Sequence, residues 1–384
     1  MEELKAYRDQ IDKIDRQLAD LFQQRMEVVD KVGQYKLAHN IPVLDAAREQ
    51  QVLQAKAALA RDEAMAADLV AVFENLMAVS RRRQRKRIRE TQERPDYTRC
   101  VQAIAAARTP IARPRVVYQG VAGAYSEMAC LNFFADGSEN IGLEQIEDVF
   151  LALKNGQADY AVLPIENSTS GAIRQVYDLL TRYAFYIVGE TTVQVEHCLM
   201  APQGASLDTV THVYSHEQGL FQCERFLNAH PDWCRVPCAD TAGAGQYVAG
   251  TGDVTKAAIC SERAAELYGL KILARGISQN TNNTTRFVVV SPVMELRPGA
   301  DKISTVFSLP HEAGSLHRIM TIFAVNGLNM TRLESRPMPG HKWEYMFFLD
   351  FVGSLAAPEL DGILRELSQT AEDFRVLGNY VARL

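Results

Sequence analysis

The sequence lacks any apolar run long enough to cross a membrane. A spanning helix needs about 20 apolar residues in a row, and no stretch of the 384 residues approaches that length. The first residues include Glu2, Glu3 and Lys5 and enter a helical pattern directly, without the apolar core of a signal peptide. We therefore predict a cytoplasmic protein with no membrane contact.

Cysteines are also few, and their spacing is irregular. The chain has 7, an odd number, which argues against a framework of disulfides. Cys234 and Cys238 are close and His230 lies near them, but no second Cys/His pair follows at zinc spacing. We predict reduced thiols and no metal site. The net charge of −6 gives no general attraction to nucleic acid.

Glycine and proline are almost absent from residues 1–92, where only Gly33 and Pro42 interrupt a helical pattern. Apolar residues recur at heptad-like spacing from Leu4 to Tyr35, which predicts one long helix whose seam needs a partner helix. A turn at 39–42 and two further helices, at 45–59 and from 64 into 87, complete an all-helical domain. Residues 93–113 contain prolines around a short helical patch at 101–107, and this composition predicts a linker.

The apolar pattern changes at residue 115. Short apolar runs end in small or hydroxyl residues and lead into helical segments, as at 116–126, 160–171, 212–219 and 257–261. Repeated strand, tight turn and helix predict α/β layers. Pro292 and Pro298 mark a second linker. The residues beyond it follow the βαββαβ order of a ferredoxin-like domain.

The seam of the first helix carries Arg25 where an apolar residue belongs. A polar seam residue can simply fix register or oligomeric state. Lys36, however, shares the face of Arg25 about 16 Å further along the axis, so two cations are placed to bind a small dianion. Arg8 lies about 25 Å in the other direction and about a quarter turn round the helix. It reaches the same ligand only from an antiparallel partner helix, which predicts an intertwined homodimer with shared sites.

Two further polar sets lie on the other predicted helices. Asp45, Arg48 and Glu49 follow the spacing of one helix face, and Ser80 and Gln84 are one turn apart. Either set alone is typical of a solvated face. The basic run at residues 81–87 fits a solvated helix end better than a nucleic-acid site, with Gln84 turned inward.

These polar residues resemble, position for position, the active-site set of the all-helical chorismate mutases. The set is Arg8, Arg25, Lys36, Asp45, Arg48, Glu49, Ser80 and Gln84. The resemblance covers nearly all of residues 1–90 and is clearest at 32–36, 42–43 and 48–49. It implies the pericyclic rearrangement of chorismate to prephenate, with Arg8 supplied by the neighbouring subunit.

The implied reaction suits these side chains because it needs no nucleophile and no proton transfer. The enzyme holds the reactive conformer and stabilises charge on the breaking ether oxygen. Lys36 and Gln84 would donate to that oxygen. Arginine forks would bind the two carboxylates, and Glu49, with Asp45 or Ser80, would hold the hydroxyl end.

Polar loops follow three of the predicted strands. The loop at 164–171 holds a carboxylate, an amide and three hydroxyls, more than capping a helix near Ala172 requires. Ser215, His216 and Gln218 follow the strand at 212–214, although a lone loop histidine is usually structural. The run 281–287 is either a surface turn or, because it leads into an apolar strand, a ligand-binding strand mouth.

These segments resemble prephenate dehydratase. The matching motifs are Gly-x-x-Gly-x-Tyr-Ser at 120–126, Leu-Pro-Ile-Glu-Asn-Ser at 163–168, Tyr-Ser-His at 214–216 and Thr-Arg-Phe at 285–287. They occur in the family's order within residues 114–291. The resemblance implies two α/β lobes with a cleft, like periplasmic binding proteins, with the second lobe at about 193–278. Glu217 and Gly219 depart from the family, which has prolines there.

The implied reaction is loss of water and carbon dioxide from prephenate, without metal or cofactor. By resemblance Thr285 is the group closest to the departing hydroxyl, and Glu166 is the alternative acid if burial keeps it protonated. The residues expected to bind this substrate are Ser126, Asn167, Ser168, Thr169, Ser215, His216, Gln218, Thr285 and Arg286. No Gly-x-Gly-x-x-Gly follows a strand, which argues against a fused nicotinamide-dependent dehydrogenase.

Residues 300–384 resemble an ACT domain of the dehydratase type. Gly314-Ser315-Leu316 matches its Gly-Ala-Leu motif with serine in place of alanine, and Glu334, Ser335 and Arg336 begin its Glu-Ser-Arg-Pro motif. The resemblance implies that phenylalanine binds where two such domains pair and inhibits the enzyme. The alternative is a ferredoxin-like domain that only dimerises.

Other interpretations of the whole chain stay open. One activity could be lost, the middle domain could be a small-molecule binding module, or the tail could regulate a nucleic-acid-binding protein. The intact polar sets argue against the first, the fused mutase and missing signal peptide against the second, and the acidic balance against the third. We predict a bifunctional, phenylalanine-inhibited homodimer or larger homo-oligomer that binds chorismate and prephenate.

Overall fold

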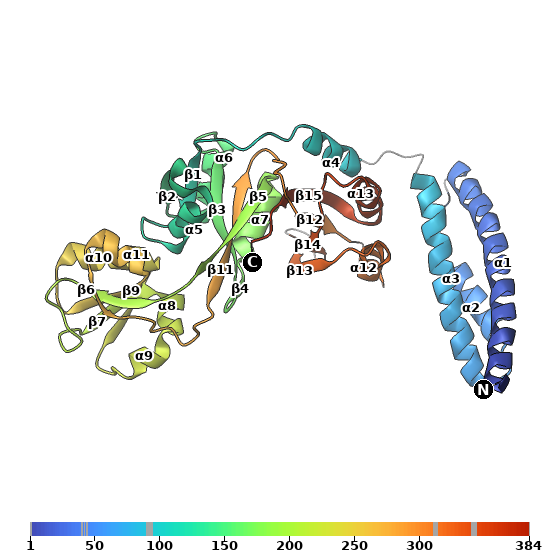
Figure 1. Cartoon of the computed structure of the whole chain (residues 1–384), viewed down its shortest axis with the longest axis horizontal. Helices are drawn as coiled ribbons and strands as arrows, with labels where there is room; N and C mark the ends of the chain where they lie inside the picture. Colours follow the sequence, from blue (N-terminus) through green and yellow to red (C-terminus); the bar gives the residue numbers. More distant parts are fainter. Residues whose placement is uncertain are drawn as a thin grey trace. The chain divides into compact units, whose positions relative to one another are not determined.

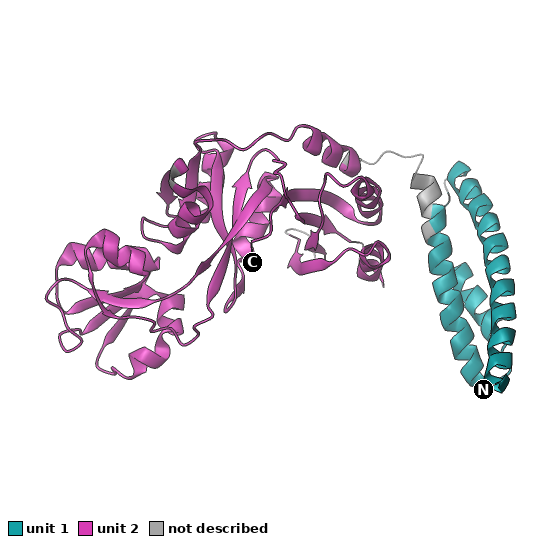
Figure 2. Ribbon diagram, in the orientation of Figure 1, with its two compact units in different colours: residues 1–95 teal, residues 96–384 magenta. Residues whose placement is uncertain are grey.

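The computed structural model describes residues 2–39, 41, 43, 45–89, 95–309, 314–338 and 344–383. The chain divides into two compact units, Met1–Pro95 and Asp96–Leu384 (Figure 2). The first unit consists of helices, whereas the second contains three β-sheets with helices packed on them (Figure 1). No helix in these described ranges is both long and apolar enough to cross a membrane.

The first unit is built from α1 (Glu2–Ala38), α2 (Ala46–Ala57) and α3 (Glu63–Arg89), which confirms the predicted helical region. The C-terminal half of α1 packs on α3 and buries Met26, Val29 and Gly33. The apolar side chains of its N-terminal half are exposed, namely Leu4, Tyr7, Ile11, Ile14, Leu18 and Leu21. The seam residues predicted further along α1, Val28, Val32 and Tyr35, are exposed as well. Among the described residues, no helix therefore covers the predicted seam, and the stripe that faces α3 is a different one. The predicted turn includes Asn40 and Pro42, which lie outside the described residues.

The α/β part of the second unit begins with a mixed sheet. Its elements are β1 (Arg115–Gln119), α5 (Tyr125–Phe134), η1 (Ala135–Gly137), β2 (Glu139–Leu143), α6 (Ile146–Lys154), β3 (Tyr160–Asn167), β4 (Gly171–Ala172), α7 (Arg174–Tyr183), β5 (Tyr186–Gln194) and β11 (Thr284–Ser291). The strand order is β2-β1-β3-β11-β5, with β4 paired to the end of β3. Strand β11 is antiparallel to both β3 and β5. Helices α6 and α7 cover one face and α5 the other.

A second sheet forms a separate lobe. Its elements are β6 (Cys198–Ala201), β7 (His212–His216), α8 (Glu217–Gln222), α9 (Glu224–Asn228), β8 (Cys234–Cys238), α10 (Thr241–Thr251), β9 (Lys256–Cys260), α11 (Glu262–Tyr268) and β10 (Lys271–Ala274). The strand order is β10-β6-β9-β7-β8. The chain leaves the first lobe after β5 and returns to it at β11, so it crosses between the lobes twice (Figure 1).

The glycine-containing motif at 120–126 lies where the two lobes touch. Tyr268 donates a hydrogen bond to the carbonyl of Ala122 at 2.6 Å, and Ser261 donates to that of Gly123 at 2.7 Å. Gly123 has a φ of +86°, and a Cβ there would lie 3.0 Å from Ala264 of α11. Glycine is needed here both for its backbone conformation and for the close approach of the second lobe.

The tail folds as β12 (Lys302–Ser308), α12 (Ser315–Val325), β13 (Met330–Pro337), β14 (Tyr345–Val352), α13 (Glu359–Thr370) and β15 (Glu372–Tyr380), which confirms the βαββαβ order. Its antiparallel sheet has the order β13-β14-β12-β15. Helices α12 and α13 cover one face. The other face packs on α7 of the first lobe, where Val306, Phe348 and Leu377 share a core with Tyr177 and Leu180.

The segment predicted as a linker at 93–113 is structured over most of its length. Helix α4 (Pro95–Ala105) packs Cys100 and Ile104 into the core of the tail. Asp96 accepts a hydrogen bond from the backbone N–H of Phe374 at 3.1 Å. The prolines misled the prediction, because a proline in the first turn of a helix removes no hydrogen bond.

Edge strands β5 and β15 bring the first lobe and the tail together. A Cβ built on Gly378 of β15 would lie 1.8 Å from the carbonyl oxygen of Ile187 on β5. No side chain fits between two backbones at that distance, so the tail docks here through a glycine.

We expect Gly378→Ala to destabilise the second unit by about 1–3 kcal/mol, because its methyl group must push β15 off β5. Chemical denaturation followed by tryptophan fluorescence and circular dichroism measures this loss. Gly362→Ala in α13 is the matched control, since a Cβ there meets nothing within 4 Å, and it should change stability by less than about 1 kcal/mol. A Gly378→Ala variant as stable as the wild type would show that the two strands can separate at no cost.

Candidate active sites

In the first unit, α1 and α3 bring three of the predicted mutase residues together. Arg25 donates to Ser80 Oγ at 2.5 Å, and burial lowers the pKa of its guanidinium from the usual value. Gln84 is 8% exposed, and its Oε1 has no hydrogen-bond partner among the described residues. A buried amide oxygen left unpaired costs about 1–3 kcal/mol. The amide of Gln84 is therefore suited to a bound ligand.

Gly33 sets the distance between α1 and the Gln84 side chain. A Cβ at position 33 would lie 3.2–3.3 Å from Cγ, Cα and Cβ of Gln84. Such contacts are tighter than ordinary packing. The glycine that interrupts the predicted helix thus lies where α3 approaches α1 closely.

The predicted residues at the start of α2 form a polar end to this site. Lys36 donates to the carbonyl of Val43 at 2.6 Å. Asp45 caps α2 by accepting from the backbone N–H of Arg48 at 2.9 Å, and both side chains are exposed. The structure thus gives Asp45 a capping role that the sequence left undecided. Among the described residues, no side chain pairs with the Arg48 guanidinium, so it is accessible to a ligand.

Two arginines of the basic run at 81–87 join α3 to the other helices of the unit. Arg81 forms an ion pair with Glu49 of α2. Arg83 binds Asp30 of α1 through a two-pronged contact, with both N···O distances 2.7 Å. Arg81 was not predicted as a site residue. The sequence clue that could have identified Arg81 is its position one helical turn after Met77, on the face of α3 that packs inward.

Arg8 stands apart from all of these groups. It lies on the exposed N-terminal half of α1 and makes no hydrogen bond or ion pair with the described residues. Its separation from Arg25 along one helix is about 25 Å. Within one chain, Arg8 does not belong to the site around Gln84.

In the first lobe, Asn167 and Thr285 meet at the paired ends of β3 and β11. They are register partners, both buried. Asn167 donates to Thr285 Oγ1 at 2.9 Å and to Asn283 Oδ1 at 2.7 Å. A hydroxyl carries one donor and two acceptor sites. Since Thr285 accepts here and no other partner for its hydroxyl exists among the described residues, its proton is free to be donated to a ligand.

The loop after β3 is organised by the same amide. Asn167 Oδ1 accepts from the backbone N–H groups of Thr169 and Ser170, each at 3.0 Å. Ser168 donates to the carbonyl of Asn282 at 3.0 Å. The helix predicted near Ala172 is wrong by two residues: the chain first folds back as β4, and α7 begins at Arg174 without a side-chain cap. Asn283, which sequence reasoning left out, was visible only as part of the polar run 281–287.

Glu166 and Arg286 lie on the opposite face of the sheet from Thr285. Successive residues of a strand point to opposite faces, and Glu166 and Arg286 are themselves register partners. Arg286 contacts Glu166 at 3.2 Å, Glu190 at 3.2 Å and Asp350 of the tail at 3.3 Å. Glu166, expected as the alternative acid, and Arg286, expected to bind substrate, therefore lie away from the Thr285 hydroxyl and are directed at the tail.

In the second lobe, Ser215 is fully buried and donates to the carbonyl of Ile259 at 2.7 Å. A Cβ on Gly219 would lie 2.7 Å from Ser215 Oγ, so a larger residue there would displace the serine hydroxyl. His216 Nδ1 accepts from the backbone N–H of Gln218 at 3.1 Å and so caps α8. His216 is exposed and Gln218 half-buried, so these two side chains, unlike Ser215, remain accessible.

The remaining predicted residues of the α/β part and tail are placed as follows. Ser126 is buried in the first turn of α5. Gly314 has a φ of +79° at the start of α12, and Ser315 is buried and accepts from Arg318 at 2.8 Å. Leu316 is partly buried in the tail core. Residues 310–313, just before this motif, lie outside the described part of the chain.

The second tail motif lies on β13, an edge strand of the tail sheet. Its burial alternates, with Glu334 and Arg336 half-buried and Ser335 exposed. Arg336 pairs with Asp178 of α7 at 3.1 Å. The motif therefore contacts the first lobe on one face and is open on the other.

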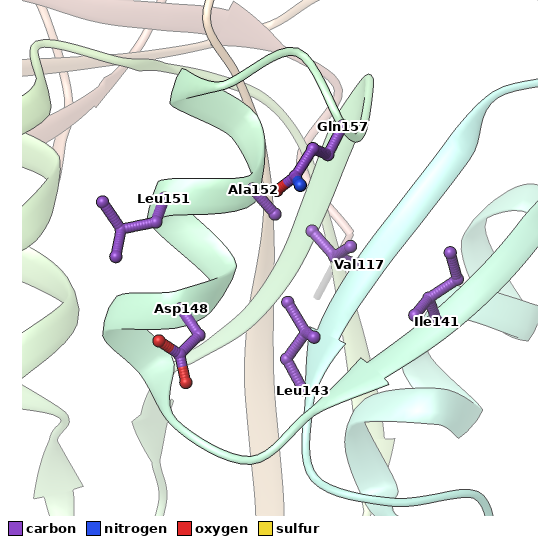
Figure 3. A pocket seen from close by; sticks show the side chains of 7 residues that line it. All are labelled: Val117, Ile141, Leu143, Asp148, Leu151, Ala152 and Gln157. Atoms are coloured by element: carbon purple, nitrogen blue, oxygen red, sulfur yellow. The ribbon is translucent and has the colours of Figure 1, made fainter.

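A shallow pocket between β2 and α6 contains none of the predicted residues (Figure 3). Its lining is mostly apolar, with one carboxylate and one amide at the rim: Val117, Ile141, Leu143, Asp148, Leu151, Ala152 and Gln157. It offers no set of groups for either reaction.

Known families match both units. Residues 7–85 match chorismate mutase type II, and residues 116–295 match prephenate dehydratase. The bifunctional chorismate mutase/prephenate dehydratase of Escherichia coli K12 is 34% identical over 387 residues, which cover 98% of this chain and 96% of that protein. The chain belongs to this bifunctional family. It is a chorismate mutase and prephenate dehydratase enzyme.

Solved structures match the second unit. One is a prephenate dehydratase of Arthrobacter aurescens in complex with L-Phe, with a TM-score of 0.63 and 30% identity over 70% of this chain and 90% of that one. Another, described as GqqA, a novel type of quorum-quenching acylase, has a TM-score of 0.64 and 33% identity over 70% of this chain and 98% of that one. Because one fold carries differently named activities, the site residues must decide the chemistry.

We expect Gly33→Ala to lower mutase kcat about tenfold, because the added methyl group displaces Gln84 by a few tenths of an ångström and catalysis is sensitive to position. Chorismate consumption by the full chain measures this effect. Prephenate consumption by the same preparation is the control, since the mutation lies in the other unit, and it should not change. Unaltered mutase kcat would mean that Gln84 position is not set by this contact.

Proposed function

We propose that this chain converts chorismate to prephenate in its helical unit and prephenate to phenylpyruvate in its two-lobed part, under inhibition by phenylalanine. The single observation that carries the assignment of residues is the Asn167–Thr285 hydrogen bond. This bond holds the buried Thr285 at the start of β11 with its hydroxyl proton available for donation. The whole-chain similarity to the bifunctional relative supports both activities.

The mutase step uses Arg25, Lys36 and Gln84 as preorganised donors. Cations near the breaking ether bond stabilise the negative charge that grows there, without taking or giving a proton. Arg25 is held by Ser80, and Arg48 supplies a second guanidinium for a carboxylate. Glu49, held by Arg81, takes the hydroxyl end of the substrate.

The helical unit acts as a dimer in which each site takes Arg8 from the other chain. The exposed apolar stripe from Leu4 to Leu21 supports this, because burying it removes a large apolar area from water. The isolation of Arg8 from Arg25 within one chain supports it as well. A symmetric pair of antiparallel α1 helices buries the stripe and delivers both arginines.

The dehydratase step releases water and carbon dioxide together. Thr285 donates its proton to the ring hydroxyl, the C–O bond breaks, and water departs; solvent water then returns a proton to the threonine oxygen. The electron pair of the bond to the carboxylate enters the ring as carbon dioxide leaves, which makes the ring aromatic. A threonine is a weak acid, so its fixed position close to the leaving oxygen provides much of the effect. His216 and Gln218 orient the substrate from the second lobe, and Ser168 and Thr169 shape the loop opposite.

Phenylalanine binds at the tail motifs, where two tails pair. The related dehydratase of Arthrobacter aurescens is in complex with L-Phe, which supports phenylalanine as the effector. In this chain the open edge of β13 and the buried Ser315 support pairing and binding at these motifs. The enzyme works in the cytoplasm, where its seven free cysteines stay reduced.

The test is a chorismate assay of the full chain that follows prephenate and phenylpyruvate separately, with the Thr285→Val variant beside the wild type. Wild type is expected to produce phenylpyruvate, and phenylalanine should suppress it. Thr285→Val has nearly the same shape but no proton to donate, so its dehydratase kcat/KM should fall about 10²–10⁴-fold.

Thr285→Ser is the matched control and should keep most dehydratase activity, because it retains the hydroxyl. Mutase activity should be the same in all three proteins. Full dehydratase activity in Thr285→Val would reject the assigned acid. Wild type that leaves prephenate unconverted would reject the dehydratase function, and wild type that leaves chorismate untouched would reject the mutase function.

Mixed dimers test the shared site. Arg8→Ala and Lys36→Ala should each inactivate the mutase. When the two variants are unfolded together and refolded, mixed dimers contain one site with both wild-type residues, so about a quarter of the wild-type activity should return. Each variant refolded alone is the control and should stay inactive. No recovery on mixing would show that Arg8 and Lys36 serve the same chain.

A further inference from the structure

The paired strands β3 and β11 carry two sets of residues on opposite faces. Asn167 and Thr285 face the proposed dehydratase site, whereas Glu166 and Arg286 face the tail. Arg286 is joined to Thr285 by a peptide bond, so a displacement of Arg286 also displaces Thr285. The tail, which contacts Arg286, is therefore one residue away from the proposed acid.

Arg286 belongs to a buried cluster of four charges. The first lobe supplies Arg286 and Glu190, and the tail supplies Lys302 from β12 and Asp350 from β14. Glu190 is fully buried and contacts Lys302 at 2.9 Å and Arg286 at 3.2 Å. Asp350 contacts Arg286 at 3.3 Å and Lys302 at 3.8 Å. Two cations and two anions thus alternate across the contact between lobe and tail.

Polar groups around the cluster satisfy its remaining oxygens. Ser304 donates to Asp350 at 2.6 Å, and the backbone N–H of Arg383 donates to Glu190 at 3.1 Å. Arg332 of β13 contacts Glu166 at 3.5 Å. Tyr380 of β15 places its ring 5.8 Å from Lys302 Nζ. Every strand of the tail sheet therefore contributes a side chain around the charges behind Thr285.

Moving one member of such a cluster leaves a buried charge without its partner, which is strongly unfavourable. A displacement of β12 or β14 in the tail is therefore expected to carry Arg286 with it. Contiguous packed and ion-paired side chains of this kind carry coupling between distant sites.

Building on the proposed function, we propose that the Glu190–Arg286–Lys302–Asp350 cluster positions Thr285 for the dehydratase step and transmits the tail's response to phenylalanine. Arg286 is then a positioning residue and not a substrate ligand. The tail strand β13 links the effector motif to this cluster, because it carries Arg332 and Arg336, which pair with Glu166 and Asp178 of the first lobe.

The experiment uses the full chain with Asp350→Asn, which keeps the side-chain shape but removes one negative charge from the cluster. The double variant Lys302→Met/Asp350→Asn keeps the cluster neutral and so preserves folding. In both, dehydratase kcat should fall about tenfold with KM changed less than about twofold, because position and not substrate contact is lost. Inhibition by saturating phenylalanine should weaken at least about fivefold.

Asp159→Asn is the matched control, since Asp159 pairs with Arg115 inside the first lobe at 3.2 Å. It should leave kcat and the phenylalanine response unchanged. Mutase activity of every variant reports the amount of active chain, and phenylalanine binding is followed by calorimetry. The cluster variants should still bind phenylalanine but respond less to it.

Hydrogen exchange of residues 284–291 gives a readout that does not depend on activity. The cluster variants should exchange faster there than the wild type and Asp159→Asn. A folded double variant with wild-type kcat, wild-type inhibition and unchanged exchange would overturn the inference. If the wild type itself fails to convert prephenate, the proposed function fails, and the exchange result alone decides whether the cluster positions β11.

Discussion

The pairing of β11 with β3 is the constraint on which the second unit depends. Strand β11 follows the whole second lobe in the chain, and its register against β3 sets Thr285 opposite Asn167 and Arg286 opposite Glu166. On one face of the sheet this register joins the loop after β3 to Thr285. On the other face it directs the Arg286 guanidinium toward the tail. A slip of one residue would exchange the two faces, so the proposed acid and the tail contact are fixed together.

In the helical unit, by contrast, a single chain leaves much of the apolar surface of α1 exposed. The half of α1 that carries Arg25 and Gly33 is packed against α3, and the half that carries Arg8 exposes its apolar residues. The heptad residues are exposed in both halves, and a different stripe of α1 faces α3. In the proposed dimer, the exposed heptad residues of the N-terminal half are where the second chain binds.

The tail is joined to the rest of its unit by more than a linker. Its sheet packs on α7, its edge strand meets β5 at Gly378, and helix α4 is packed into its core before the first lobe begins. The charges of Glu190 and Lys302 are buried at this contact. A tail attached in this way moves together with β11, which a flexible connection would not achieve, and the proposed regulation depends on that coupling.

The sequence alone determined the helical first unit, the α/β layers and the βαββαβ tail, because periodicity and turn residues are local properties of the chain. Its motifs also pointed to the family and to Asn167 and Thr285, which stand at strand ends. It misplaced the helix after β3 and the extent of the linker, since prolines and capping residues do not show what packs on a segment. Only the tertiary structure decided that Arg286 and Glu166 face the tail, that Ser215 is used inside the second lobe, and that Gly33 and Gly378 are points of close approach. These depend on which distant segments meet, and strand alternation and the close packing of two backbones cannot be assigned until the partner strand and its register are known.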